Sequence, residues 1–239
     1  EILRYANHIA DRYNLRPDIQ FNTRIESQTW DDERARWTVT TDAGDVIDAQ
    51  HVVLAVGTLS APKLPEIPGI ERFKGEWYQT QKFPKEGVNF IGKRVAVIGT
   101  GSSAIQAIPE IAKTCKQLTV FQRTPNFSFP AGNRPLDRKE VDETKADYAG
   151  VRRQARESFF GQTGPEATQS ALEVSSKERV RRYQEGWDDG QLISVLGAYD
   201  DLITNKAAND SIADFIRDRI RETVKDPVTA EALCPYDHP

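Results

Sequence analysis

A glycine-rich turn between a short apolar strand and a helix constrains this chain more than any other feature. Residues 93–98 read Lys-Arg-Val-Ala-Val-Ile, Gly99-Thr-Gly-Ser-Ser-Ala104 follows directly, and a helical pattern covers residues 105–115. A GxGxxA sequence in this strand–turn–helix context is typical of a Rossmann-type dinucleotide-binding unit. The sequence therefore predicts an α/β fold built around such a unit.

Each position of the turn has a small residue for a different physical reason. Gly99 permits the tight turn, Gly101 lets a pyrophosphate approach the backbone, and Ala104 allows the helix to pack closely on the strand. The free N–H groups at the start of the helix attract phosphate, together with the positive end of the helix dipole. We expect the phosphate-binding loop to consist of Gly99, Thr100, Gly101, Ser102 and Ser103.

The second strand of this unit ends without a carboxylate. Residues 118–121 are followed by Gln122, Arg123 and Thr124, at the place where an NAD site has Asp or Glu. A guanidinium and a hydroxyl group suit a 2′-phosphate. Arg123 and Thr124 therefore predict NADP(H) as the cofactor, and the alternative is that Arg123 is a solvated surface arginine.

Ahead of the glycine-rich turn, the sequence predicts a helix, a meander and one buried strand. Residues 1–13 have helical spacing, and residues 21–25, 37–41 and 46–47 are strand-like, which predicts an antiparallel meander. Residues 51–57 form an apolar run that ends in glycine. We expect this run to be a strand buried on both faces, as in a parallel sheet.

After Pro135 the sequence is charged and helical to its end. Ser175 and Glu178 have the spacing of a capping box, Asp210 is expected to start an amphipathic helix, and Asp226-Pro227 to start a last short one. Trp187, Phe159 and Phe160 are expected to pack in the interior, with the wall of a substrate pocket as the alternative. Two arginine clusters are expected on solvated helix faces rather than in a nucleic-acid site: Arg152, Arg153, Arg156 and Arg179, Arg181, Arg182.

The changes of sequence pattern along the chain predict four segments. Prolines and glycines mark residues 58–92 as a linker, which follows a first segment at residues 1–57. The dinucleotide-binding segment covers residues 93–135, and a helical insertion covers residues 136–239.

Composition excludes several classes of protein. The formal net charge is −4 and the isoelectric point is about 5.6, so no net field attracts nucleic acid. The longest apolar run, residues 52–56, is far shorter than the roughly 20 residues that cross a bilayer. No charged segment followed by an apolar stretch, the pattern of a secretory signal, opens the chain. We expect neither a nucleic acid nor a membrane as partner.

The cysteines and histidines are few and scattered. Cys115 and Cys234 have no CxxC spacing, which favours buried structural thiols in a reducing compartment, the cytoplasm. His8, His51 and His238 form no cluster with them, so we expect no metal site. The sequence also contains no methionine, which leads us to expect an internal piece of a longer protein.

The chain resembles flavin-dependent Baeyer–Villiger monooxygenases, the phenylacetone and cyclohexanone monooxygenase group, over nearly its whole length. The resemblance implies FAD and NADPH as cofactors and a ketone and O2 as substrates, with one oxygen atom inserted beside the carbonyl to give an ester or lactone. The matching stretches are Glu1-Ile-Leu-Arg-Tyr5, Gly92-Lys-Arg-Val95, Val97-Ile-Gly-Thr-Gly-Ser-Ser103, Val120-Phe-Gln-Arg-Thr124, Asn133-Arg-Pro-Leu-Asp137, Ser170-Ala-Leu-Glu-Val-Ser175 and Asp237-His-Pro239.

The fingerprint of these enzymes, FxGxxxHxxxW followed by Pro or Asp, is partly present. Phe73, Gly75 and Pro84 fit it, whereas Gln79 replaces the histidine and Phe83 replaces the tryptophan. Glutamine cannot become charged near neutral pH. Phenylalanine at position 83 is more typical of the related N- and S-oxidising flavin monooxygenases. A further alternative is that residues 73–84 form an ordinary linker loop and no fingerprint.

A second flavin-side motif of this group, at the domain hinge, resembles Ala55-Val56-Gly57. Val56 departs from it, because the group has Ser or Thr there. The end of a plain buried strand explains these residues equally well. The resemblance makes Ala55 and Gly57 candidate hinge residues.

The resemblance also implies what the chain does not contain. The glycine motif that binds FAD is expected upstream of Glu1, and the active-site arginine just beyond Pro239. The chain is then part of a flavin-domain segment joined to the NADP-binding segment and a helical insertion, with the FAD site mostly elsewhere. The alternative is a nonenzymatic NADP-binding module that acts as a redox sensor or binds a partner.

We expect the purified 239-residue chain to show no ketone-dependent oxidation of NADPH, because the active-site arginine and most of the FAD site are expected outside it. The measurement is the NADPH absorbance with and without cyclohexanone. Turnover by the chain alone would contradict this account of where the catalytic residues lie.

Overall fold

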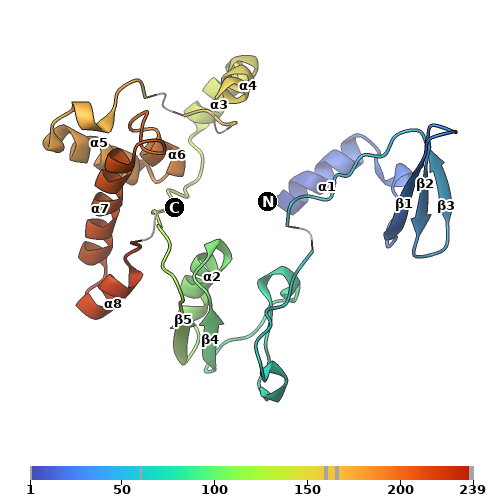
Figure 1. Cartoon of the computed structure of the whole chain (residues 1–239), viewed down its shortest axis with the longest axis horizontal. Coiled ribbons are helices and arrows are strands. Elements are labelled where there is room, and N and C mark those ends of the chain that lie inside the picture. Colours follow the sequence, from blue (N-terminus) through green and yellow to red (C-terminus); the bar gives the residue numbers. More distant parts are fainter. Residues whose placement is uncertain (1, 60, 159–160, 165–166, 237–239) are drawn as a thin grey trace. The chain divides into compact units, whose positions relative to one another are not determined.

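The computed structural model describes residues 2–59, 61–158, 161–164 and 167–236. The chain divides into two compact units, Glu1–Phe83 and Pro84–Pro239, and Figure 1 shows their helices and strands. Both contain helices and strands, and the second contains the predicted parallel strand pair. The predicted α/β class is confirmed.

The first unit contains a helix and a three-stranded sheet. The helix α1 (Ile2–Arg12) precedes β1 (Ile25–Asp31), β2 (Arg36–Thr41) and β3 (Val46–Ala49), which pair antiparallel in sequence order. The meander is therefore confirmed. Single 3₁₀ turns fill parts of the remainder: η1 (Arg16–Asp18), η2 (Ile70–Arg72) and η3 (Thr80–Lys82).

The first strand begins later than the sequence predicts. Residues 21–24 are not in a strand, and β1 starts at Ile25. The partner strand β2 ends at Thr41, where a turn to Asp45 begins. The residues before Ile25 therefore have no length of β2 to pair with. Two bonds between Arg24 and Asp42 close this end: the Asp42 N–H donates to the Arg24 carbonyl (2.9 Å), and the Arg24 N–H donates to the Asp42 carboxylate (3.0 Å).

The prediction of a buried strand at residues 51–57 is wrong. The segment has no strand structure, and the exposed fraction is 86% for Val53 and 65% for both Leu54 and Val56. A strand buried on both faces needs neighbouring strands and covering layers. No described residue pairs with this segment as a strand partner.

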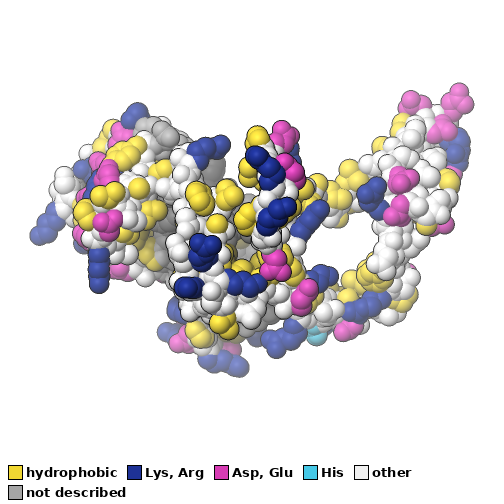
Figure 2. All heavy atoms as spheres, turned by 90° about the horizontal axis from the view of Figure 1, so that it is seen from below, with side chains coloured by type: hydrophobic (Ala, Val, Ile, Leu, Met, Phe, Trp, Pro, Cys, Tyr) yellow, Lys and Arg dark blue, Asp and Glu magenta, His cyan; other side chains and the backbone are white. Residues whose placement is uncertain are grey.

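Exposed hydrophobic side chains are not confined to this segment. Figure 2 shows them in yellow on one face of the molecule.

The second unit opens with the predicted α/β element. Strands β4 (Arg94–Ile98) and β5 (Gln117–Phe121) are parallel, and helix α2 (Ser102–Ala112) connects them. The following helices are α3 (Arg138–Ala146), α4 (Tyr148–Glu157), α5 (Ser176–Asp189), α6 (Leu192–Leu196), α7 (Lys206–Thr223) and α8 (Pro227–Leu233), with a 3₁₀ turn η4 (Ala171–Glu173) before α5.

Side-chain caps set the starts of these helices. The Ser175 Oγ accepts the N–H of Glu178 at the start of α5 (3.3 Å), and Asp226 caps α8 ahead of Pro227, as the sequence predicts. The predicted start of α7 at Asp210 is wrong. Asn205 caps α7 by accepting the N–H of Ala207 (3.0 Å), so the helix starts one turn earlier.

The core of the second unit is built by aromatic residues of α5 and α7. The Tyr183 ring lies 5.7 Å from the Tyr199 ring and 5.6 Å from the Phe215 ring, and Trp187 packs against Phe215 at 6.1 Å. The predicted packing role of Trp187 is confirmed; Phe159 and Phe160 lie outside the described residues. The buried members of the core are Ala171, Tyr183, Val195, Tyr199, Leu202, Ala208, Ile212, Phe215 and Ile216.

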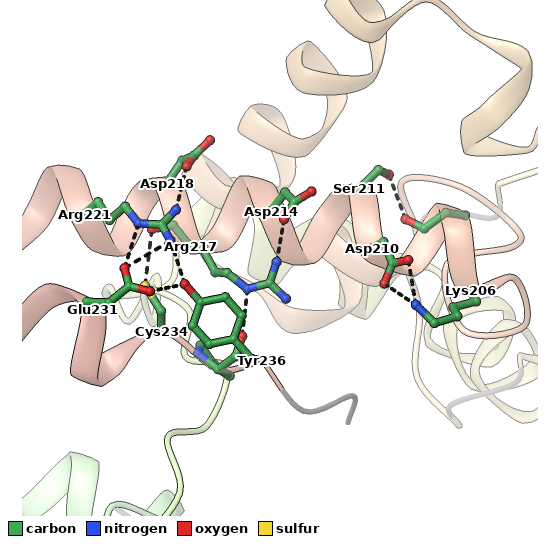
Figure 3. Close-up of polar contacts among 12 residues, drawn as sticks. Lys206, Asp210, Ser211, Asp214, Arg217, Asp218, Arg221, Glu231, Cys234 and Tyr236 are labelled. Atoms are coloured by element: carbon green, nitrogen blue, oxygen red, sulfur yellow. Dashed lines mark hydrogen bonds and ion pairs between the residues drawn. The ribbon is translucent and has the colours of Figure 1, made fainter.

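The end of the described chain is bonded to α7 (Figure 3). The buried Arg217 donates from Nε to the Pro235 carbonyl (2.7 Å), and its guanidinium lies 4.9 Å from the Tyr236 ring centroid. The Tyr236 hydroxyl accepts from Arg221 (2.9 Å) and donates to Glu231. Cys234, 1% exposed, lies in the same network as a buried thiol, as predicted; Cys115 is half-buried.

The prediction of a solvated helix face is wrong for two arginines of α5, Arg179 and Arg182, which contact the core. Arg179 donates to the Ala171 carbonyl (2.8 Å), and the half-buried Arg182 lies 5.0 Å from the Tyr199 ring centroid. Both contacts tie α5 to the core, which the charge pattern alone does not indicate. The prediction of exposure is right for Arg152, Arg153, Arg156 and Arg181.

Asp201 links the turn η4 to the start of α7. Its carboxylate accepts from the Ser170 hydroxyl (2.6 Å), from the Ala171 N–H (2.9 Å) and from the side-chain amide of Asn205 (3.3 Å), the N-cap of α7. Burial by itself raises the pKa of Asp201, but these hydrogen bonds outweigh it and hold the pKa below its usual value. A lowered pKa stabilises the folded state above the ordinary aspartate value of about 4, and this stabilisation is lost as the pH falls through the lowered value.

We expect Asp201→Asn to lower the free energy of unfolding at pH 7 by about 1 kcal/mol, because the ionised acceptor of three hydrogen bonds is lost. The difference from the wild type should shrink as the pH falls below about 4. Denaturant titrations at several pH values measure both effects. The neighbouring exposed Asp200 is the control, and an equal loss in Asp200→Asn would argue against the role of Asp201.

Candidate functional site

The parallel pairing of β4 and β5 brings the candidate cofactor residues to one edge. The last pair of the register joins Ile98 to Phe121, and the Gly99 N–H then donates to the Phe121 carbonyl at 2.8 Å. The glycine-rich loop and residues 122–124 therefore start from adjacent positions. In open α/β sheets, ligands bind at this carboxyl edge of the strands.

The two glycines of the loop differ in the reason for having no side chain. Gly99 has a φ of +99°, a left-handed conformation that L side chains rarely adopt. Gly101 has an ordinary φ of −71°, and a Cβ built on it meets no atom within 4 Å. The backbone at Gly101 is therefore open to the close approach of another molecule, which fits the pyrophosphate that the sequence predicts.

The start of α2 adds the donors of such a site. Gly101 is the N-cap of the helix and, as a glycine, has no side chain to accept the first N–H groups. A helix of this length attracts anions to its free N–H groups. Thr100, Ser102 and Ser103 belong to the same turn, so the structure brings the five predicted loop residues together.

A cavity of about 420 Å³ lies beside this turn. Its polar wall includes Thr100 and Ser102, and Asn126 closes the loop by donating to the Thr100 carbonyl (3.4 Å). Its other wall is mostly apolar and was not predicted from the sequence; the residues there are Ile105, Phe127, Phe129, Pro130, Ala131, Gly190 and Leu192. The apolar run Phe127-Ser-Phe-Pro130, shortly after the second strand, is the sequence signal that could have indicated this wall.

Arg123 and Thr124 are exposed at the carboxyl end of β5. Within the described part of the chain, no carboxylate forms an ion pair with Arg123, which leaves its guanidinium available to an anion. Arg134 differs, because it binds Glu140, and this bond lowers the pKa of Glu140 to about 2. The Gln122 amide donates to the Ala232 carbonyl of α8 (2.7 Å) and so fixes the residue next to Arg123.

The fingerprint residues are held by local contacts. A Cβ on Gly75 would lie 2.6 Å from the exposed Phe73 ring, so a side chain there would displace this ring. The Gln79 amide donates to the Lys63 carbonyl (2.8 Å), and its buried Oε1 has no hydrogen-bond partner among the described residues. The Phe83 ring lies 5.9 Å from the Tyr78 ring. Pro84 is the first residue of the second unit.

The candidate hinge residues have a simpler environment. Ala55 and Gly57 are exposed, and Gly57 has a φ of +72° with no atom within 4 Å of a built Cβ. The conformation explains a glycine at position 57. The hinge role of both residues stays a prediction.

The described ranges also bear on two other kinds of site. No group of three or more His, Cys, Asp or Glu side chains there is arranged to hold a metal ion. Over the same residues, no helix is both long and apolar enough to span a bilayer.

Comparison with known proteins identifies the family. A family model described as pyridine nucleotide-disulphide oxidoreductase matches residues 1–143. The chain belongs to this family. Enzymes of known activity are also similar to it: 38% of residues are identical over 238 residues to cyclohexanone 1,2-monooxygenase of Acinetobacter sp, and 37% over 245 residues to 2-oxo-Delta(3)-4,5,5-trimethylcyclopentenylacetyl-CoA monooxygenase of Pseudomonas putida.

Solved structures of monooxygenases are also similar to this chain. A steroid monooxygenase bound to NADP is 48% identical with a TM-score of 0.93, and the match covers 99% of this chain and 45% of that one. The two enzymes named above match 99% and 100% of this chain, which spans 44% and 45% of their lengths. The resemblance to Baeyer–Villiger monooxygenases is confirmed, and the chain corresponds to less than half of such an enzyme.

We expect Arg123→Ala to weaken the binding of NADPH much more than that of NADH, because only NADPH has the 2′-phosphate that a guanidinium would bind. Titration of the protein with each nucleotide measures this difference. Arg152→Ala, an exposed arginine on α4, should change neither affinity. Equal losses for both nucleotides in Arg123→Ala would refute the assignment.

Proposed function

We propose that the whole protein is an FAD- and NADPH-dependent monooxygenase that inserts one atom of O2 beside the carbonyl of a ketone, giving an ester or lactone. The observation that carries this proposal is the open backbone at Gly101, next to the free N–H groups of α2 and at the same sheet edge as Arg123. Support comes from relatives named as monooxygenases of cyclohexanone and cyclopentanone.

In this proposal the chain binds and orients the nicotinamide cofactor. The loop N–H groups from Thr100 to Ser103 hold the pyrophosphate, and Gly99, whose own N–H is bonded to the Phe121 carbonyl, shapes the turn. Arg123 and Thr124 hold the 2′-phosphate. NADPH supplies the reducing equivalents and FAD activates O2 when they are bound. Residues outside this chain hold most of the FAD, and the segments 1–57, 58–92, 93–135 and 136–239 act as flavin-domain part, linker, NADP-binding part and helical insertion.

The proposed partners are small molecules. The substrates are a ketone and O2, and we propose neither a nucleic acid nor a membrane partner, in keeping with the net charge of −4. The cytoplasm is the proposed location, because two cysteines without a disulfide framework suit a reducing compartment.

A second candidate function is oxidation at nitrogen. The chain is 39% identical over 238 residues to phenazine N-monooxygenase of Lysobacter antibioticus, of which it spans 44%. Gln79 and Phe83 both depart from the Baeyer–Villiger fingerprint. An aromatic nitrogen heterocycle is therefore the alternative substrate class for the same cofactors.

We expect the whole protein, loaded with FAD, to oxidise NADPH faster in the presence of cyclohexanone and to form the lactone with one labelled oxygen from ¹⁸O2. Mass spectrometry of the product measures the incorporation, because a monooxygenase transfers one oxygen atom to its substrate. An assay with phenazine in place of the ketone is the parallel arm. An N-oxide with no lactone would select the second candidate, and NADPH oxidation that yields only peroxide with both would reject both.

A further inference from the structure

The cavity beside the start of α2 has a wall that comes from the helical part of the second unit. Gly190, which ends α5, and Leu192, which begins α6, line the cavity together with Thr100 and Ser102 of the phosphate loop. These residues are some ninety positions apart in the sequence. The fold thus builds one cavity from two distant segments.

A direct contact between two glycine backbones joins these segments. The Gly132 N–H donates to the Gly190 carbonyl at 2.9 Å. A Cβ on Gly190 would lie 2.5 Å from both the Cα and the N of Gly132, and a Cβ on Gly132 would lie 2.5 Å from the Asp189 carbonyl oxygen. Any side chain at either position would therefore force the two backbones apart.

The segment between the phosphate loop and this contact is fixed at both ends. At one end Asn126 donates to the Thr100 carbonyl, and at the other end Gly132 bonds to Gly190. In between, the Phe129 ring packs edge-on against Trp187 (6.2 Å), which in turn contacts Phe215 of the core. The apolar wall is thereby attached to the hydrophobic core of the helical part.

We propose that Gly132 and Gly190 are positioning residues for the bound dinucleotide. Their contact sets how far the apolar wall, with Phe127, Phe129 and Leu192, stands from the phosphate loop. The wall then packs against the sugar or ring faces of a nucleotide whose phosphates lie on the loop. This inference rests on the proposed NADPH binding and adds that the helical part determines the affinity through the shape of the cavity.

The wall contacts parts that NADPH and NADH share, so its loss has a signature different from that of Arg123. We expect Gly190→Ala to raise the Kd of both nucleotides about tenfold, which corresponds to about 1.4 kcal/mol. Gly132→Ala should do the same. Arg123→Ala, by contrast, should discriminate between the two nucleotides.

Gly92→Ala is the matched control, because Gly92 also has a φ of +69° but has no atom within 4 Å of a built Cβ. It introduces the same backbone strain at the amino end of β4, away from the cavity. We expect it to lower the melting temperature as Gly190→Ala does and to leave both Kd values within about twofold. The measurements are titration of the whole protein with each nucleotide and its thermal unfolding.

Leu192→Ala tests the wall without altering the glycine contact. Leu192 is 54% exposed, so its truncation should leave the fold intact and still raise both Kd values, which keeps the inference testable if Gly190→Ala fails to fold. The inference is overturned if Leu192→Ala or a folded Gly190→Ala binds both nucleotides like the wild type, or if Gly92→Ala weakens binding equally. A wild-type protein that does not bind NADPH would instead overturn the proposed function itself.

Discussion

The parallel pairing of β4 with β5 is the interaction on which the candidate site depends. It places the ends of two strands side by side, so that the Gly99 N–H reaches the Phe121 carbonyl at 2.8 Å. The turn into α2 and the exposed Arg123 then leave the sheet at one edge. Free N–H groups and a guanidinium both attract phosphate, so this edge concentrates anion-binding groups. Among the described residues, no carboxylate forms an ion pair with Arg123 that would compete with a bound phosphate.

The loop shows how a glycine required by the backbone differs from one that leaves room for a ligand. Gly99 is required because its φ is positive, whereas a side chain at Gly75 would displace the exposed Phe73 ring. Neither reason applies to Gly101, whose φ is ordinary and whose surroundings are open. Gly132 and Gly190 form a third class, since each excludes a side chain from the other. Of these glycines Gly190 lines the cavity, so its contact with Gly132 bears on the cavity's shape.

The two departures in the fingerprint both form local contacts. Gln79 donates a hydrogen bond to the Lys63 carbonyl, and Phe83 packs against the Tyr78 ring. What Gln79 does not supply is a charge near neutral pH, so any step that needs a cation at this position would differ from that in enzymes with histidine.

Local signals in the sequence determined the elements that depend on neighbouring residues. The glycine-rich turn, the cap at Ser175 and the proline after Asp226 act within a few residues, and each of these elements is found. The helix after the turn, however, covers Ser102–Ala112 and not the predicted residues 105–115, because it begins directly at its N-cap Gly101. The apolar run at residues 51–57 was misread, because burial on two faces depends on partners that the local pattern cannot specify.

Start positions show the same limit. Asn205 is a better placed cap than Asp210, and β1 can pair only as far as β2 extends. The tertiary structure alone decided that Gly190 meets Gly132 and that the helical part lines the cavity beside the loop. The physical reason is that periodic spacing can show which face of a helix is buried, as for Phe215 in α7, but not which distant residues that face meets. The packing of Tyr183, Trp187 and Phe215 decides those contacts.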